Sequence, residues 1–296
     1  MATTHPTGNF LRGVLMGMAD LVPGVSGGTV ALLTGIYERL VRAVRSLTGL
    51  PLALLMLDAG RARKHARQTD WLLVVPVLAG MAAAIVAGAS VIPGLIEDHP
   101  ELMYGLFFGL IVGSLPTPWR QVGGIGPRQL VTMGIAALAA FLLVGISGGA
   151  QLDPALPVVF LAAMVAICAM VLPGISGSFL LLVMGVYEAT LTAVSDRNLT
   201  YVGVFALGAL TGLTLFSRVL SWLLDRYHAA TMAAVTGLLV GSLRALWPWR
   251  SDEGAALQAP SGTAAEVALV VAVMVGGALV AALVARYGSR LAPRDR

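Results

Sequence analysis

Charge is scarce in this sequence. Only 11% of its 296 residues are charged and 57% are hydrophobic, which gives a mean hydropathy of +0.86. A soluble domain carries about 25% charged residues, so the deficit excludes a disordered chain, a coiled coil and almost any cytosolic globular domain. The composition indicates a polytopic membrane protein. At about 20 apolar residues for each span, the chain has room for about six to nine membrane crossings.

Residues that bind metals or carry out catalysis are also few. Cys168 is the single cysteine, which excludes an intrachain disulfide and a cysteine-based metal cluster. No cluster of histidine, cysteine and carboxylate residues suggests a metal site. The glycines at 24–28 are followed by no Lys-Ser/Thr pair of a P-loop. We therefore expect no metal and no cofactor, and the net charge of +4 is explained by membrane topology without a nucleic-acid partner.

Six runs without charged residues are each long enough for one helical membrane span. The six runs are 71–96, 102–119, 129–152, 198–217, 229–243 and 267–285. They predict six ordinary transmembrane helices.

Two further apolar segments, 13–37 and 154–187, are broken in the middle. The second is 34 residues long, and a straight helix of that length would measure about 51 Å, against a hydrocarbon core of about 30 Å. Two full spans and a turn would need more than about 40 residues. The breaks read Pro-Gly-Val-Ser-Gly-Gly at 23–28 and Pro-Gly-Ile-Ser-Gly-Ser at 173–178. We expect each segment to be a re-entrant hairpin, in which two short helices meet at a tip inside the membrane.

The two broken segments are copies of one another. Residues 18–38 align with 168–188 at an offset of 150, and nine of the 21 positions are identical, including helix breakers and polar residues. Residues 109–115 align with 237–243 at an offset of 128. The chain is therefore predicted to consist of two repeats. The first is 10–148, with a hairpin at 10–38, a basic cytoplasmic segment at 39–70 and three spans; the second is 155–290, with a hairpin at 155–190 and three spans.

The second repeat is predicted to be inverted relative to the first, because three spans are an odd number. The segment 39–70 contains seven basic residues and should be cytoplasmic, whereas the loops 97–101 and 148–156 contain none and should lie outside. On this topology both termini are cytoplasmic. The predicted fold is an all-α polytopic membrane protein with an inverted-topology repeat, the architecture of secondary transporters.

The tips have the composition of an anion site. A helix that restarts after Pro-Gly-x-Ser-Gly presents unpaired N–H groups and the positive end of its dipole, and glycines let a ligand come close to the backbone. Two tips that face each other near the midplane are predicted to bind an anion such as phosphate. The predicted phosphate-binding residues of the tips are Gly24, Ser26, Gly27, Gly28, Thr29, Gly174, Ser176, Gly177 and Ser178. The alternative is that each motif is only a tight turn between closely packed helices.

Three acidic residues in or beside these segments are candidates for ion coupling, because charge is costly in a membrane. Asp20 lies three residues before Pro23, near the first tip. It could bind a cation, carry a proton, or only cap the break between the half-helices. Glu38 and Glu188 end the returning half-helices, where they either couple to an ion or are solvated at the interface.

Two arginines are candidate phosphate ligands. Arg218 lies late in a span and is predicted to face the cavity and contact phosphate, although it could instead extend to the interface. Arg244 follows the second Gly-Ser-Leu copy and is a weaker candidate of the same kind.

Together these motifs resemble the bacterial polyprenyl-phosphate transporter family. The resemblance covers nearly the whole chain and depends on the residues 18–29 with 35–38, 172–177 with 185–188, and 241–249. It implies that undecaprenyl phosphate, a lipid carrier, is moved from the outer to the cytoplasmic leaflet of the bacterial inner membrane for reuse in cell-envelope synthesis. It implies a transporter and not an enzyme.

The expected mechanism is rocking of the two halves around the phosphate, coupled to a proton or sodium gradient. Two alternatives remain open, and so does the oligomeric state. One is a transporter or channel for a small soluble anion, whose cavity would be closed to lipid. The other is an intramembrane lipid-phosphate hydrolase, which would need Ser26 or a histidine, but none of the four histidines lies in the middle of an apolar segment.

Overall fold

The computed structural model describes residues 5–21, 26–88, 91–124, 126–146, 154–250 and 257–291, and within these ranges it contains helices and no β-strand. The predicted all-α class is confirmed for this part of the chain. The helices are α1 (Pro6–Asp20), α2 (Gly27–Leu33), α3 (Tyr37–Leu55), α4 (Ala59–Gln68), α5 (Trp71–Gly88), α6 (Val91–Asp98), α7 (Pro100–Ser114), α8 (Pro116–Gln121), α9 (Pro127–Val144), α10 (Leu156–Val171), α11 (Gly177–Val183), α12 (Tyr187–Ser195), α13 (Leu199–Arg226), α14 (His228–Ser242), the 3-10 turn η1 (Leu243–Leu246) and α15 (Ala264–Leu291).

Six helical stretches of the described chain are long and apolar enough to cross a membrane, as predicted. They are α5, α7 with α8, α9, α13, α14 with η1, and α15. The first is shorter than expected, because α5 ends at Gly88 and α6 forms a separate helix. One straight helix over 71–96 would measure about 39 Å, which exceeds a hydrocarbon core of about 30 Å.

Both predicted breaks occur as interruptions between helices. In the first copy α1 ends at Asp20 and α2 begins at Gly27, and in the second α10 ends at Val171 and α11 begins at Gly177. The helices α2 and α11 have bounds that differ by the offset of 150, and α7 and α14 have bounds that differ by 128. The axes of α11 and α12 differ by 108°. The copies in the sequence therefore contain helices with matching bounds.

The glycine after each short helix explains one pair of identical residues in the copies. Gly35 has a φ of +72° and Gly185 a φ of +69°. This left-handed conformation lets the amide of Ile36 donate to the carbonyl of Ala31, at 2.9 Å, and closes the end of α2. The chain after α11 makes the equivalent bond at the same distance.

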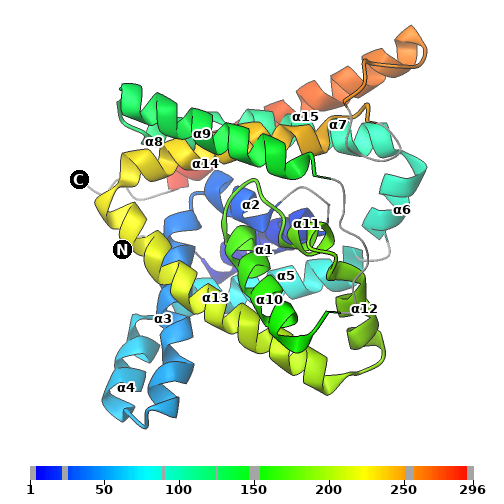
Figure 1. The fold of residues 1–296 in the computed structure, drawn as a ribbon. Helices are drawn as coiled ribbons and strands as arrows, with labels where there is room; N and C mark the ends of the chain where they lie inside the picture. Colours follow the sequence, from blue (N-terminus) through cyan, green and yellow to red (C-terminus); the bar gives the residue numbers. More distant parts are fainter. Residues whose placement is uncertain are drawn as a thin grey trace.

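Four helix pairs form the body of the protein, and glycines spaced four residues apart bring them close. The pairs are α1 with α5, α10 with α13, α7 with α15, and α9 with α14 (Figure 1). Small residues at this spacing let membrane helices approach closely. A Cβ added to Gly109 in α7 would collide with the carbonyl oxygen of Met274 in α15. In each of the other pairs, a Cβ added to the glycines of one helix would likewise collide with the backbone of its partner. The corresponding glycines are Gly13 and Gly17 in α1, Gly208 and Gly212 in α13, and Gly237 and Gly241 in α14.

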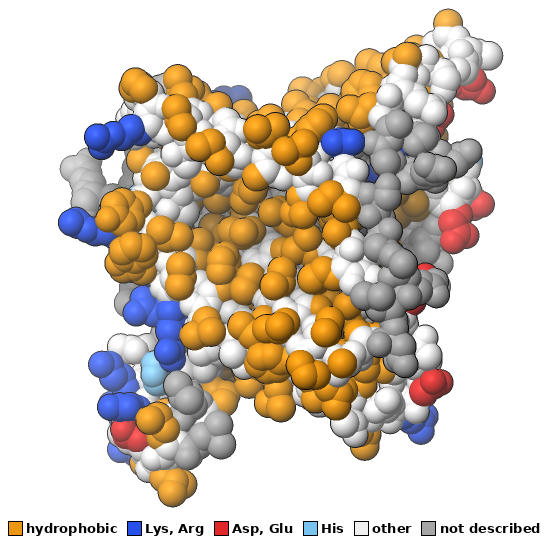
Figure 2. Space-filling model, viewed as in Figure 1, with side chains coloured by type: hydrophobic (Ala, Val, Ile, Leu, Met, Phe, Trp, Pro, Cys, Tyr) orange, Lys and Arg blue, Asp and Glu red, His pale blue; other side chains and the backbone are white. Residues whose placement is uncertain are grey.

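The two ends of this body differ in charge. In Figure 2 an apolar belt occupies the middle of the face, Lys and Arg side chains gather toward the left and Asp and Glu side chains toward the right. The basic helix α4 packs beside α3, and the pair stands out from the body at the lower left of Figure 1.

The close contact between α7 and α15 can be tested with Gly109→Ala. The added methyl group collides with backbone, so we expect the free energy of unfolding to fall by about 1–3 kcal/mol, measured by thermal unfolding in detergent. Gly134→Ala in α9 is the control, because its Cβ would meet nothing within 4 Å and alanine favours a helix by up to about 1 kcal/mol over glycine. Equal stability of the two variants would contradict this packing.

Candidate functional site

The two breaks lie against each other, and Ser26 joins them. Its hydroxyl donates to the carbonyl oxygens of Met170, at 3.2 Å, and Leu172, at 3.4 Å, next to the second break. The same oxygen accepts from the amide of Gly28 at 3.1 Å and caps α2. Ser26 is only 1% exposed. A single hydroxyl thus caps one half-helix and binds the backbone where the other copy is interrupted.

Two more side chains of the first hairpin bind the second break. The hydroxyl of Thr29 accepts from the amide of Gly174 at 3.2 Å, and the hydroxyl of Tyr37 donates to the carbonyl of Val171 at 3.3 Å. Both Thr29 and Tyr37 are 3% exposed. Backbone groups at an interrupted helix need partners where there is no water, and these hydroxyls supply them. Side chains that follow the first break are thus hydrogen-bonded directly to the main chain at the second break.

Asp20 caps the break in the first hairpin. Its Oδ1 accepts from the amide of Gly27 at 2.7 Å, at the start of α2. The capping role considered for Asp20 is thus present, and it places a carboxylate where the first tip presents N–H groups. In the second copy, Met170 takes the place of Asp20 and lies beside Gly177. The two tips therefore differ in charge.

The second tip is polar and partly open. The hydroxyls of Ser176 and Ser178 are 2.8 Å apart, and Ser176 accepts from the amide of Phe179 at 3.5 Å. Ser176 and Gly177 are buried, whereas Ser178 is exposed. Gly24, also predicted as a ligand, lies outside the described residues.

A groove of about 250 Å³ reaches the first tip between the two halves. Its walls are apolar side chains of α1, α3, α5, α10 and α13, including Leu40 and Val44 of α3 and Leu78 of α5. Polar groups occur where Asp20, Gly27 and Gly28 line it, and at Ser217 of α13. The groove is thus an apolar channel that ends at the contact of the two breaks.

A second cavity, of about 410 Å³, lies on the other side of the first hairpin. Residues of α1, α2, α6, α7 and α15 line it, and all but Thr29 and Thr34 are apolar. Thr29 thus stands between this cavity and the second break. Both cavities suit a hydrocarbon chain better than a soluble ion.

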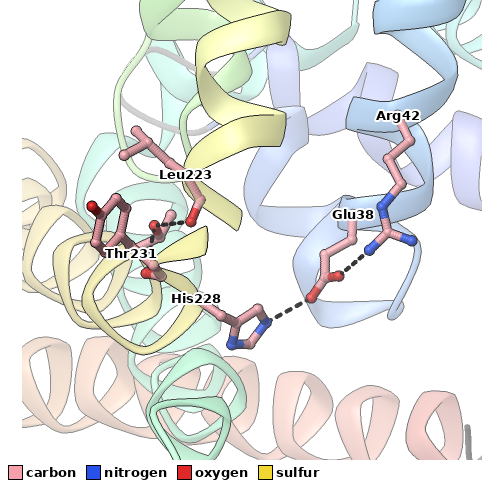
Figure 3. A network of polar contacts seen from close by, with 6 residues as sticks. Glu38, Arg42, Leu223, His228 and Thr231 are labelled. Atoms are coloured by element: carbon pink, nitrogen blue, oxygen red, sulfur yellow. Dashed lines mark hydrogen bonds and ion pairs between the residues drawn. The ribbon is translucent and has the colours of Figure 1, made fainter. Parts of the chain in front are cut away.

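Glu38 connects the first hairpin to the turn between α13 and α14 (Figure 3). Its carboxylate binds Arg42 at 2.7 Å and Nε2 of His228 at 2.9 Å. Nearby, the hydroxyl of Thr231 donates to the carbonyl of Leu223 at 3.2 Å. Glu38 therefore lies in a polar network between α3 and α14, whereas its copy, Glu188, is exposed.

The structure does not bring the two candidate arginines to the tips. Arg218 is exposed on α13, and its neighbour Ser217 lines the groove instead. Arg244 donates to the carbonyl of Phe141, at 3.0 Å, and its guanidinium lies 4.5 Å from the centre of that ring. Arg244 thus stabilises the end of α9, where a cation favours the helix dipole.

Comparisons with known proteins agree with this arrangement. Residues 16–265 match the model of the VCA0040-like family, described as undecaprenyl phosphate translocase-like. The chain belongs to this family. Two relatives are named polyprenyl-phosphate transporter: one from Vibrio cholerae is 37% identical over 84% of this chain and 80% of its own, and one from Staphylococcus aureus is 32% identical over 81% and 86%. No solved structure matches the chain.

Some polar contacts of this translocase-like chain have no signal in the sequence. The partners of Ser26 are main-chain carbonyls, and His228 is 190 residues away from Glu38. Tyr37 is marked in the sequence only by its identity with Tyr187 in the second copy, although its hydroxyl joins the two breaks. Identity between the copies is thus the one sequence signal that points to this contact.

The hydrogen bonds between the breaks can be tested with Thr29→Val, which removes one hydroxyl and keeps the shape. The buried amide of Gly174 loses its acceptor, so we expect a loss of about 1–3 kcal/mol of stability. Thr132→Val is the matched control, since that hydroxyl bonds only within α9, to the carbonyl of Arg128, and should change stability by less than about 0.5 kcal/mol. Equal melting temperatures of the two variants would show that the Thr29 bond is not formed.

Proposed function

We propose that this protein translocates a polyprenyl phosphate, undecaprenyl phosphate in the cell, from the outer to the cytoplasmic leaflet for reuse in cell-envelope synthesis. Membership of the translocase-like family and the names of two relatives support the substrate class. The observation that carries the proposal is the groove, which is apolar along its walls and polar where it meets the first tip. A prenyl chain fits such walls, whereas a small soluble anion would find no polar lining along them.

We propose further that the chain is an inverted repeat, 10–148 and 155–290, with re-entrant hairpins and both termini in the cytoplasm of the bacterium. The matched bounds of α2 with α11 and of α7 with α14 support two equivalent halves. The helix pairs also support two equivalent halves. Helix α7 of the first half packs against α15 of the second, and α14, the equivalent of α7 in the second half, packs against α9 of the first. The basic and acidic ends in Figure 2 support the orientation, with the basic end inside.

The phosphate is proposed to bind at the tips. The second tip suits an anion better in this conformation, because Met170 stands where the first tip has Asp20, and Ser178 is exposed. Ser176, Gly177 and Ser178 would then receive the headgroup first. After the breaks rearrange, the headgroup would also contact the other predicted tip ligands, which are Ser26, Gly27, Gly28, Thr29 and Gly174. Arg218 and Arg244 would contact it only if α13 and η1 move.

Ion coupling is proposed to act through Asp20. Its carboxylate binds the amide at the start of α2, so an approaching phosphate meets a like charge there. Neutralisation of Asp20 by a proton, or its pairing with sodium, would remove this repulsion. Glu38 and Glu188, at the ends of the returning half-helices, would be secondary coupling groups.

The proposed activity can be tested with the full-length protein in liposomes that contain a fluorescent short-chain polyprenyl phosphate. We expect the protein to make the label of the inner leaflet accessible to a membrane-impermeant quencher, at a rate that rises with an imposed proton or sodium gradient. Protein-free liposomes and a fluorescent phosphatidylcholine are the controls. A rate equal to that of protein-free liposomes would contradict the proposal.

The same assay tests the coupling group through Asp20→Asn. The amide oxygen of asparagine can still accept from the amide of Gly27, so the cap is retained while the charge is lost. We expect translocation that no longer responds to the gradient. A gradient response as large as that of the wild type would exclude Asp20 as the coupling group.

A further inference from the structure

Two arginines lie near the start of α5, beside the groove. Arg12 of α1 is held by Asn9, which binds the carbonyl of Leu72, and Arg39 of α3 is held by Asp70, two residues before Leu72. Arg39 is bound to Asp70, just before α5, at 2.6 Å, and its side chain is 37% exposed. The cluster of Arg12, Arg39 and Asp70 therefore holds two positive charges against one negative charge, at the junction of three helices.

A buried asparagine positions Arg12. Asn9 is 0% exposed, and its side-chain amide donates to the carbonyl of Leu72 in α5 at 2.7 Å. This bond orients the oxygen Oδ1, which accepts from Nη1 of Arg12 at 2.9 Å. An exposed arginine that serves only topology needs no such fixed partner, because it can extend freely into water.

The cluster continues into the wall of the groove. Arg12, Met16 and Asp20 are spaced four residues apart and share one face of α1, and Met16 and Asp20 line the groove. On α5, Val74 lines the groove one turn after Asp70, and on α3 Leu40 follows Arg39 directly. The cationic cluster therefore borders the groove. Arg12 and Asp70 lie one helical turn before lining residues of α1 and α5, and Arg39 lies between the lining residues Tyr37 and Leu40 of α3.

Glu38, next to Arg39, binds Arg42 and His228. Among the described contacts of the two arginines, the carboxylate is that of Asp70. Arginine suits phosphate oxygens because its N–H groups can bind two of them at once, so a guanidinium that already has one partner can also bind a phosphate.

We infer that Arg12 and Arg39 form a second phosphate site, which holds the monoester headgroup of a prenyl lipid while the prenyl chain occupies the groove. The inference rests on the proposed function and adds a headgroup position distinct from the tips. With the basic end in the cytoplasm, this is the position of the lipid at the cytoplasmic leaflet. Asn9 is a positioning residue of the site, and Asp70 competes with the phosphate for Arg39.

The site can be tested by the binding of farnesyl phosphate, a soluble prenyl monophosphate, to the full-length protein in phosphatidylcholine nanodiscs. Arg12→Gln and Arg39→Gln should each weaken binding about ten-fold or more, as expected for loss of a charged hydrogen bond. Arg45→Gln is the matched control, since it removes the same charge from an exposed position of α3. An equal loss of binding in Arg45→Gln would show only a general attraction of phosphate to basic residues and would overturn the inference. Unchanged binding in both Arg12→Gln and Arg39→Gln would also overturn it.

Further ligands identify the source of the phosphate. Inorganic phosphate should bind more weakly than farnesyl phosphate, and phosphatidylglycerol, a diester with one charge, should compete poorly. Equal binding of inorganic phosphate would contradict the role of the groove, and efficient competition by phosphatidylglycerol would show a general site for anionic lipids. Each of these results would overturn the inference.

Asp70→Asn gives an effect of the opposite sign. It removes the carboxylate that competes for Arg39, so farnesyl phosphate should bind several-fold more tightly, and unchanged or weaker binding would contradict direct contact with Arg39.

The inference and the proposed function can be refuted separately. If the wild type translocates lipid but the arginine variants bind normally, only this site is refuted. If the arginines bind the phosphate but liposomes show no translocation, only the proposed function is refuted.

Discussion

The contact between the two interrupted helices is the constraint on which the rest of the structure depends. A break in a membrane helix leaves amide and carbonyl groups without partners, and each costs several kcal/mol if it stays unsatisfied. Here Ser26, Thr29 and Tyr37 of one hairpin bind the main chain of the other break. The second break thus depends on side chains of the first copy, whereas the start of α2 is capped by its own Asp20 and Ser26. The same contact leaves polar groups, among them the carboxylate of Asp20, at one end of an apolar groove.

The distribution of charge follows from this arrangement. Ionisable residues are costly in the membrane, and most of them lie toward the two ends of the body (Figure 2). Asp20 is the exception near the tips, where it caps α2. On the same face of α1, Arg12 lies eight residues before Asp20, beside the groove. The groove thus has a carboxylate at the first tip and apolar walls.

Much of this fold could be predicted from the sequence, because helix breakers and polar residues are costly in apolar segments and occur there where the fold requires them. The duplicated Pro-Gly-x-Ser-Gly motif predicted the two interruptions between helices, and charge-free runs predicted the six long apolar helical stretches. The partners of Ser26 could not be predicted, since they are main-chain carbonyls of residues 144 and 146 positions away. Arg218 was expected to face the cavity and is exposed instead, because the direction of one side chain depends on how α13 rotates against α10. Nothing in the sequence marks Arg12, since its role depends on α3 and α5.

The central claim is that a prenyl phosphate lies in the groove between the halves. The most direct measurement is photo-crosslinking with a polyprenyl phosphate that carries a diazirine in its chain, followed by mapping of the labelled peptides. We predict that labelling concentrates on groove residues of α3 and α5, such as Leu40, Val44 and Leu78, and that unlabelled polyprenyl phosphate suppresses it while phosphatidylglycerol does not. Labelling spread evenly over exposed residues such as Ile135 of α9, with no specific competition, would contradict this claim.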